Sequence, residues 1–257
     1  MVRFLQPSKA NFVITPILAK FNTPKMGVKI KISTAFEEND AILDKWSHVV
    51  VATGTSPNIP EFTYESGVRV LTYEDVLKFK FPVQSPVVVI GAGGVACDVA
   101  KYILKTPNPL QASSNYLQNN MTDCIASQYT EGAIPSPKVT ILQRSSKKLA
   151  YKLGRTTRWI LIQELTQLGG MFMRGASIES ISKCAVKAIL IDRKQMSIPA
   201  KTIVLATGQN PNLLVTSFLE IKNIPFTVIG SASKSINERG SISSSIKSGY
   251  NFALSIN

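Results

Sequence analysis

The chain has 257 residues, of which 44% are apolar and 18% are charged, and this globular composition excludes an intrinsically disordered protein. Its formal net charge of +13 meets the first criterion for nucleic-acid binding, but the basic residues are spread over the whole chain, so we predict no nucleic-acid partner. Three scattered cysteines exclude a disulfide framework and a metal cage. Neither a signal peptide nor an apolar run long enough for a membrane span is visible, so we expect a cytoplasmic protein with no membrane partner.

The predicted elements alternate between strands and helices. A half-buried strand at 28–33 precedes an apolar strand at 48–54. Thr72 and Asp75 then have the spacing of a helix-capping pair within a strand and helix at 68–79. The further elements are a strand, turn and helix at 87–104, a strand at 138–144, a helix at 156–170 closed by glycines, short strands within 171–181 and 186–198, strands at 201–208 and 226–230, and a helix at 240–255. The polar stretch at 106–137 is longer than an ordinary loop.

Two segments echo each other, VVVATGTSPN at 49–58 and IVLATGQNPN at 203–212. A strand–helix–strand unit lies between them, which is typical of one nucleotide-binding fold nested inside another. We therefore predict an α/β protein, with a Rossmann-like NAD(P)-binding domain inserted in an incomplete FAD-binding domain. The expected domains are 1–80 for the first part of the FAD-binding domain, 81–213 for the NADPH-binding domain and 214–257 for the last part of the FAD-binding domain.

The turn at residues 91–96 carries the clearest functional motif, since Gly91-Ala92-Gly93-Gly94-Val95-Ala96 fits the dinucleotide-binding pattern G-x-G-x-x-A. Gly91 allows the tight turn, Gly93 lets the backbone approach a pyrophosphate, and Ala96 permits close helix–strand packing. The phosphate would lie against free N–H groups at the helix N-terminus. A glycine turn without a ligand is the alternative.

The end of the next strand indicates which nucleotide is bound. An NAD site expects Asp or Glu there, whereas this sequence has Arg144, followed by Lys147 and Lys148, and no carboxylate. Arginine pairs bidentately with a 2′-phosphate, and a nearby lysine adds charge. The sequence therefore favours NADPH over NADH, and the alternative is a solvated basic turn.

Several segments resemble the C-terminal half of the bacterial NADPH-dependent 2,4-dienoyl-CoA reductases, in the old-yellow-enzyme group: VLTYEDVL, VVVIGAGGVACDVAKYIL, KVTILQRSSKKLAYKLGRTTRWIL and IVLATGQNPN. The segment LGRTTRWI (153–160) is the most specific, because the family carries L-G-K-T-T-G-W-I there. The resemblance implies that NADPH gives hydride to FAD. Electrons then pass through an iron–sulfur cluster to FMN in a TIM barrel, where dienoyl-CoA is reduced during β-oxidation of unsaturated fatty acids.

The resemblance also implies cofactor-binding residues. NADPH is assigned to the turn at Gly91, Ala92, Gly93, Gly94, Val95 and Ala96, and to Arg144 and Lys148. Ala206 and Gly208 of the second ATG segment are further cofactor-binding residues. FAD is assigned to Ala52, Thr53, Gly54 and Gly230.

The chain also departs from that family. It has no barrel, and therefore no FMN or iron–sulfur site, and it lacks the first glycine-rich turn of the FAD-binding domain. The segment GSASKSINERGSI (230–242) carries serines where the family has glycine and an acid, so FAD binding by this chain alone is doubtful.

We thus expect an oxidoreductase module, truncated at its N-terminus, that is not competent for the full reaction alone. It would need a separately encoded FMN/iron–sulfur TIM-barrel part, and the alternative is a folded but catalytically inactive remnant. No catalytic or metal-binding residue is predicted, and His48, Cys97 and Asp98 are expected to be structural.

Overall fold

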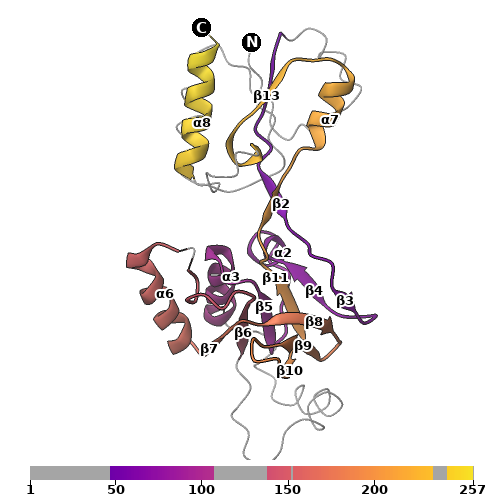
Figure 1. Cartoon of the computed structure of the whole chain (residues 1–257), viewed down its shortest axis with the longest axis vertical. Coiled ribbons are helices and arrows are strands. Elements are labelled where there is room, and N and C mark those ends of the chain that lie inside the picture. The colour runs from indigo at the N-terminus through magenta and orange to yellow at the C-terminus, as the bar shows by residue number, and fades with distance from the viewer. Residues whose placement is uncertain (1–46, 107–137, 152, 234–241, 257) are drawn as a thin grey trace, which may run out of the picture. The chain divides into compact units, whose positions relative to one another are not determined.

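The computed structural model describes residues 47–106, 138–151, 153–233 and 242–256, which fall into two compact units. One unit comprises residues 57–208, and the other comprises the described residues up to 56 and from 209 onward (Figure 1). The chain passes between the units through β2 (Thr55–Pro57) and β12 (Gln209–Pro211), which pair with each other. The predicted strand at 28–33 and nearly all of the polar stretch at 106–137 lie outside the described residues.

A five-stranded parallel sheet forms the centre of the 57–208 unit. Its strand order is β4-β11-β5-β6-β7, and every neighbouring pair runs parallel. The strands are β4 (Val70–Thr72), β11 (Thr202–Leu205), β5 (Val87–Ile90), β6 (Val139–Gln143) and β7 (Gly170–Arg174). All residues of β5, β6 and β11 are buried, as expected for strands covered on both faces.

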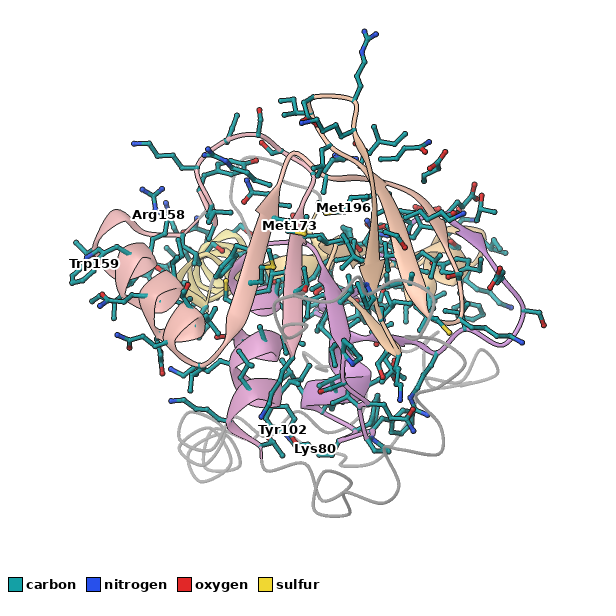
Figure 2. All side chains as sticks on the ribbon, turned by 90° about the horizontal axis from the view of Figure 1, so that it is seen from below. Lys80, Tyr102, Arg158, Trp159, Met173 and Met196 are labelled. Atoms are coloured by element: carbon teal, nitrogen blue, oxygen red, sulfur yellow. The ribbon has the colours of Figure 1, made fainter. Side chains whose placement is uncertain are left out.

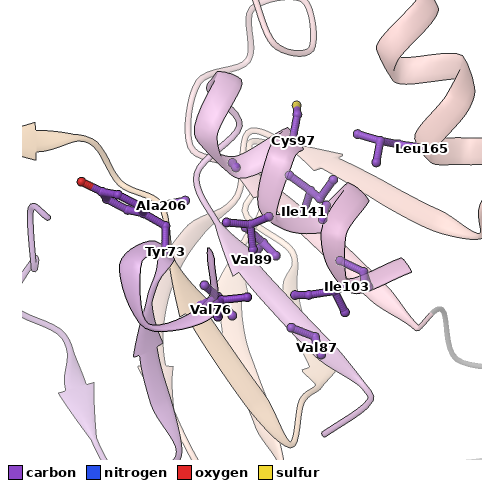
Figure 3. Close-up of a cluster of buried hydrophobic side chains, with 14 of the residues drawn as sticks. Tyr73, Val76, Val87, Val89, Cys97, Ile103, Ile141, Leu165 and Ala206 are labelled. Atoms are coloured by element: carbon purple, nitrogen blue, oxygen red, sulfur yellow. The ribbon is translucent and has the colours of Figure 1, made fainter. Parts of the chain in front are cut away.

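Successive residues of β5 point to opposite faces of this sheet. Val87 and Val89 join a core that the helices cover (Figure 3), and these are α2 (Tyr73–Leu77), α3 (Gly94–Lys105) and α6 (Arg155–Gln167). Val88 and Ile90 join a second core with antiparallel strands, which are β8 (Ser177–Ile181), β9 (Ala185–Ile189) and β10 (Gln195–Pro199). The short β3 (Thr63–Tyr64) pairs with β8. This layered α/β arrangement is the Rossmann-like fold that the sequence predicts.

The predicted cap of α2 is confirmed. The Thr72 Oγ1 accepts a hydrogen bond from the Asp75 N–H at 3.3 Å, and the Asp75 carboxylate accepts one from the Thr72 N–H at 2.7 Å. After α2, the Lys80 Nζ lies 4.3 Å from the centroid of the Tyr102 ring, which joins this segment to α3 (Figure 2). The glycine closure of α6 is confirmed as well, because Gly169 follows the C-cap at a φ of +86°.

The compact unit starts at residue 57, earlier than the boundary expected after residue 80, and it ends at 208 instead of 213. The pairing of β4 with β11 explains the difference at the start. The helix that follows β4 also buries Tyr73 and Val76 in the core on the helical face. Residues 57–80 therefore pack with the sheet that carries the glycine turn.

The second unit has a small sheet, in which β1 (Val49–Val51) pairs in parallel with β13 (Phe226–Val228). Its other elements are α7 (Leu214–Ile221), a 3-10 turn at Gly230–Ala232 and α8 (Ile242–Ser255). Val49, Val51, Leu219 and Ile224 form its core. Helix α7 was not predicted from the sequence, whereas the bounds of α8 lie within two residues of the predicted helix at 240–255. In the part of the chain that the structure describes, no helix has the length and apolar character needed to cross a membrane.

Candidate nucleotide-binding site

Three neighbouring strands of the parallel sheet end at one edge. Gly91 follows β5, Arg144 follows β6, and Ala206 follows β11. In the sheet, β5 lies between β11 and β6. In open α/β sheets, ligands bind outside the carboxyl ends of the strands, where the connections change side. The sheet therefore brings together most of the residues that the sequence analysis assigned to the nucleotide.

Gly91 has to be a glycine for two geometric reasons. Its φ is +115°, which other residues rarely adopt. A Cβ atom at this position would also lie 2.1 Å from the carbonyl oxygen of Ala206. Main-chain hydrogen bonds fix the approach, since the Gly91 N–H donates to Leu142 O at 2.9 Å and the Ala206 N–H donates to Ile90 O at 2.8 Å. The turn and the second ATG segment are thus packed backbone against backbone.

Packing within the chain does not require a glycine at position 93, because no atom lies within 4 Å of a Cβ built there. Gly93 is the N-cap of α3, with a φ of −82° and no capping side chain. The first main-chain bond of the helix runs from the Cys97 N–H to Gly93 O at 3.1 Å. The N–H groups of Gly94, Val95 and Ala96 precede that bond and have no acceptor within the helix. Open space and free donors at a positive helix end suit a pyrophosphate.

The rest of the turn packs tightly. A Cβ at Gly94 would lie 3.3 Å from the Leu153 side chain, and Ala96 is fully buried in the core on the helical face. These contacts agree with the packing role expected of Ala96.

The basic turn after β6 is exposed at Arg144, Lys147 and Lys148, and Lys147 Nζ lies 5.0 Å from the centroid of the Tyr151 ring. The residue that holds this turn is the buried Gln143, which was not among the site residues predicted from the sequence. Its Nε2 donates to the carbonyl oxygens of Ser145 and Lys147, both at 2.8 Å, and its Oε1 accepts from the Ala150 N–H at 3.0 Å. The only signal in the sequence is that Gln143 ends a strand that is apolar apart from Thr140, and this position does not predict its hydrogen bonds.

The second ATG segment, residues 206–208, follows β11 at the same edge of the sheet. The Thr207 hydroxyl donates to Asn58 O at 2.6 Å, and the Asn58 N–H donates to Gly208 O at 3.0 Å. Gly208 has a φ of +116° and no atom within 4 Å of a Cβ, so its backbone is open to a ligand.

The residues assigned to FAD all lie in the other unit. The Thr53 hydroxyl donates to Asn212 O, and Gly54 is open, with a φ of +75° and no atom within 4 Å of a Cβ. The Gly230 N–H, by contrast, already donates to the Ser248 Oγ at 3.2 Å. The sequence has one G-x-G-x-x-A turn, and that turn belongs to the unit at 57–208. The residues assigned to FAD are therefore not accompanied by a glycine-rich turn within the described part of their own unit.

The reactive side chains near the turn fit the structural roles expected of them. Burial and the neighbouring Asp98 carboxylate raise the pKa of Cys97 to about 11, so its thiol stays protonated. Desolvation raises the pKa of Asp98, and the Lys101 ammonium opposes that shift. In the other unit, the His48 ring stacks on Phe252 and places Nε2 2.9 Å from the Thr227 hydroxyl. The described residues contain no group of three or more metal-ligating side chains.

Residues 20–229 match the family model of the pyridine nucleotide-disulphide oxidoreductases. The chain is 30% identical over 239 residues to an NADH oxidase of Thermoanaerobacter brockii, which covers 90% of this chain and 31% of that protein. It is 24% identical over 215 residues to a metal reductase of Desulforamulus reducens, covering 81% of this chain and 32% of that protein. A solved 2-naphthoyl-CoA reductase in complex with 2-naphthoyl-CoA shares the fold, with a TM-score of 0.69, 20% identity, and coverage of 91% of this chain and 31% of that one. The chain thus spans about a third of the length of the curated relatives it matches.

Proposed function

Because the chain belongs to the pyridine nucleotide-disulphide oxidoreductase family, we propose that it is the NADPH-binding module of a flavin-dependent oxidoreductase. The observation that carries this proposal is the glycine turn at the carboxyl edge of the sheet. There Gly93 leaves open space beside the free N–H groups of α3, and Gly91 packs against Ala206. Bound NADPH supplies a hydride, and the residues of this chain bind and orient the nucleotide.

The basic turn supports NADPH over NADH. Arg144 stands directly after β6, at the position where an NAD-binding site carries an acid. Its guanidinium can pair bidentately with the 2′-phosphate, and Lys148 and Lys147 add positive charge. The pyrophosphate accepts hydrogen bonds from the N–H groups of Gly94, Val95 and Ala96 at the start of α3.

The flavin is proposed to bind mainly to polypeptide outside the described residues. One support is the sequence, which has a single dinucleotide turn. The other is α8, whose packed side uses Ser245, Ser248 and Phe252 to contact the rest of its unit. A different side of the helix carries an apolar row that is 57–68% exposed, made of Ile242, Ile246, Tyr250 and Leu254. An exposed apolar row of this kind marks a surface for contact with another polypeptide.

The reaction is proposed to follow the resemblance to the 2,4-dienoyl-CoA reductases. A separate FMN/iron–sulfur TIM-barrel part would then reduce an unsaturated acyl-CoA with electrons that this module takes from NADPH. The module itself contributes nucleotide binding and no acid or base.

Isothermal titration calorimetry of the purified 257-residue chain tests the nucleotide assignment. NADPH is expected to bind more tightly than NADH. The Arg144→Ala variant is expected to weaken NADPH binding about 10- to 100-fold, because a hydrogen bond to a charged group contributes about 1.5–3 kcal/mol. Lys187→Ala, which removes one exposed charge from β9, is the control and should leave both affinities unchanged. The absence of NADPH binding at millimolar concentration would refute the proposal.

A catalytically inactive remnant is the second candidate. The hydrogen bond from the Gly230 N–H to Ser248 favours it, because that donor is taken up within the chain. An absorption spectrum of the purified chain can contradict this second candidate. A chain that retains flavin through purification, and whose flavin absorbance bleaches on addition of NADPH, contradicts the remnant.

A further inference from the structure

Gln143 is the last residue of β6 and one of the few buried polar side chains of the described chain, with 5% of its surface exposed. A buried amide is costly unless its donors and acceptor are satisfied. Here Nε2 makes two hydrogen bonds of 2.8 Å and Oε1 makes one of 3.0 Å, all of them to main-chain atoms. The amide therefore shapes the backbone around it.

Those three bonds span one segment, the basic turn at residues 144–150. The carbonyl oxygens of Ser145 and Lys147 face the amide from one part of the turn, and the Ala150 N–H faces it from the end. Further contacts hold the base of the turn, since the Gly175 N–H donates to Ser145 O at 3.3 Å and the Ala176 N–H donates to Gln143 O at 3.1 Å. The Gln143 amide thus makes three of the hydrogen bonds that hold the turn, and the Ser145 Oγ adds a fourth by accepting from the Lys147 N–H at 3.2 Å.

The three cations proposed for the 2′-phosphate are all carried by this turn. Arg144, Lys147 and Lys148 are exposed, so hydrogen bonds within the turn, and not the packing of these three side chains, fix their backbone. A bidentate arginine contact requires a defined direction of approach. Holding a binding loop in its bound conformation before the ligand arrives raises affinity, because less ordering entropy is lost on binding.

We propose that Gln143 is a positioning residue that sets the preference for NADPH over NADH. This inference rests on the proposed function, because it concerns the same nucleotide site. Gln143 acts through the basic turn and touches no phosphate itself. Its loss therefore affects the 2′-phosphate, which only NADPH carries, and spares the glycine turn, which serves both nucleotides.

Two variants of the full chain test the proposal by calorimetric titration with NADPH and with NADH. Gln143→Met keeps the approximate volume and removes all three hydrogen bonds, and Gln143→Leu removes the same bonds with a shorter apolar side chain. Each is expected to raise the Kd for NADPH about tenfold and to leave the Kd for NADH within about twofold. Because neither substitution introduces a charge beside Arg144, the Leu variant provides the test if the Met variant does not fold.

Thr140→Val is the matched control, since Thr140 is a polar residue of the same strand with 3% of its surface exposed. It is expected to alter thermal stability without changing the ratio of the two affinities. An unchanged ratio of the two affinities in a folded Gln143 variant overturns the inference, whether both affinities stay as in the wild type or both weaken equally, as a purely structural role would produce. A wild-type chain that binds neither nucleotide overturns the proposed function itself, so the two failures are distinguishable.

Discussion

Replacing Gly91 by alanine tests the architecture of the candidate site directly. The added methyl group would lie 2.1 Å from the Ala206 carbonyl oxygen and 2.7 Å from its carbonyl carbon. The obstacle is backbone and not the end of a flexible side chain, so β5 and β11 have to separate locally. The φ of +115° at this position would also be strained for alanine.

The cost can be approximated from these two effects. A residue held in an unfavourable backbone region costs of order 1–3 kcal/mol. Weakening the hydrogen bond from the Ala206 N–H to Ile90 O, which is 2.8 Å long, adds about 1 kcal/mol. We therefore expect Gly91→Ala to lower the free energy of unfolding by about 3 kcal/mol. For a domain of this size, that loss lowers Tm by roughly 6–12 °C.

Thermal unfolding followed by circular dichroism measures this loss, and Gly93→Ala is the matched control. Gly93 has a φ of −82° and free space around a Cβ, so its substitution should cost less than about 1 kcal/mol, the scale of a changed N-cap. Its methyl group would instead enter the space proposed for the pyrophosphate and weaken nucleotide binding. Equal melting temperatures for Gly91→Ala and the wild type would refute the close approach of Gly91 to Ala206.

Three further outcomes are expected. Thr72→Ala removes the hydroxyl that caps α2 and should lower the free energy of unfolding in urea by about 1 kcal/mol, whereas Thr72→Ser, which keeps a hydroxyl, should lose much less. An Ala variant as stable as the wild type would contradict the cap. Hydrogen bonds from Lys101 and Lys105 lower the pKa of Glu164, so the stabilisation they give is present above the pKa of the unfolded state and is lost as the pH falls through the pKa of the folded state. The difference in urea midpoint between the wild type and Glu164→Gln should therefore shrink below about pH 5. A difference that stays constant with pH would argue against the ion pairs. Cys97 is buried and has a pKa of about 11, so it should resist iodoacetamide at pH 8 in the folded protein and react after unfolding. Mass spectrometry of the Cys97 peptide measures the labelling, and rapid labelling of the native protein would contradict the burial of this thiol.

Local patterns in the sequence were sufficient for several of these features. The pair Thr72 and Asp75 specifies a capping box because both partners lie within one helical turn. The apolar run at 87–90 followed by the glycines specifies a strand, turn and helix, because side-chain periodicity and glycine freedom act over a few residues. Arg144 could be placed at a strand end for the same reason.

Other features depend on contacts between residues far apart in the sequence, and only the tertiary structure decided them. Residues 57–80 join the larger unit because β4 pairs with β11, more than 130 positions further along the chain, and no local pattern encodes that pairing. The need for glycine at position 91 comes in part from the Ala206 carbonyl, which reaches it through the sheet. Gln143 reads as an ordinary polar residue in the sequence. Its role emerged only when the folded turn placed two carbonyl groups and one N–H around its buried amide, because a hydrogen-bond network exists only in three dimensions.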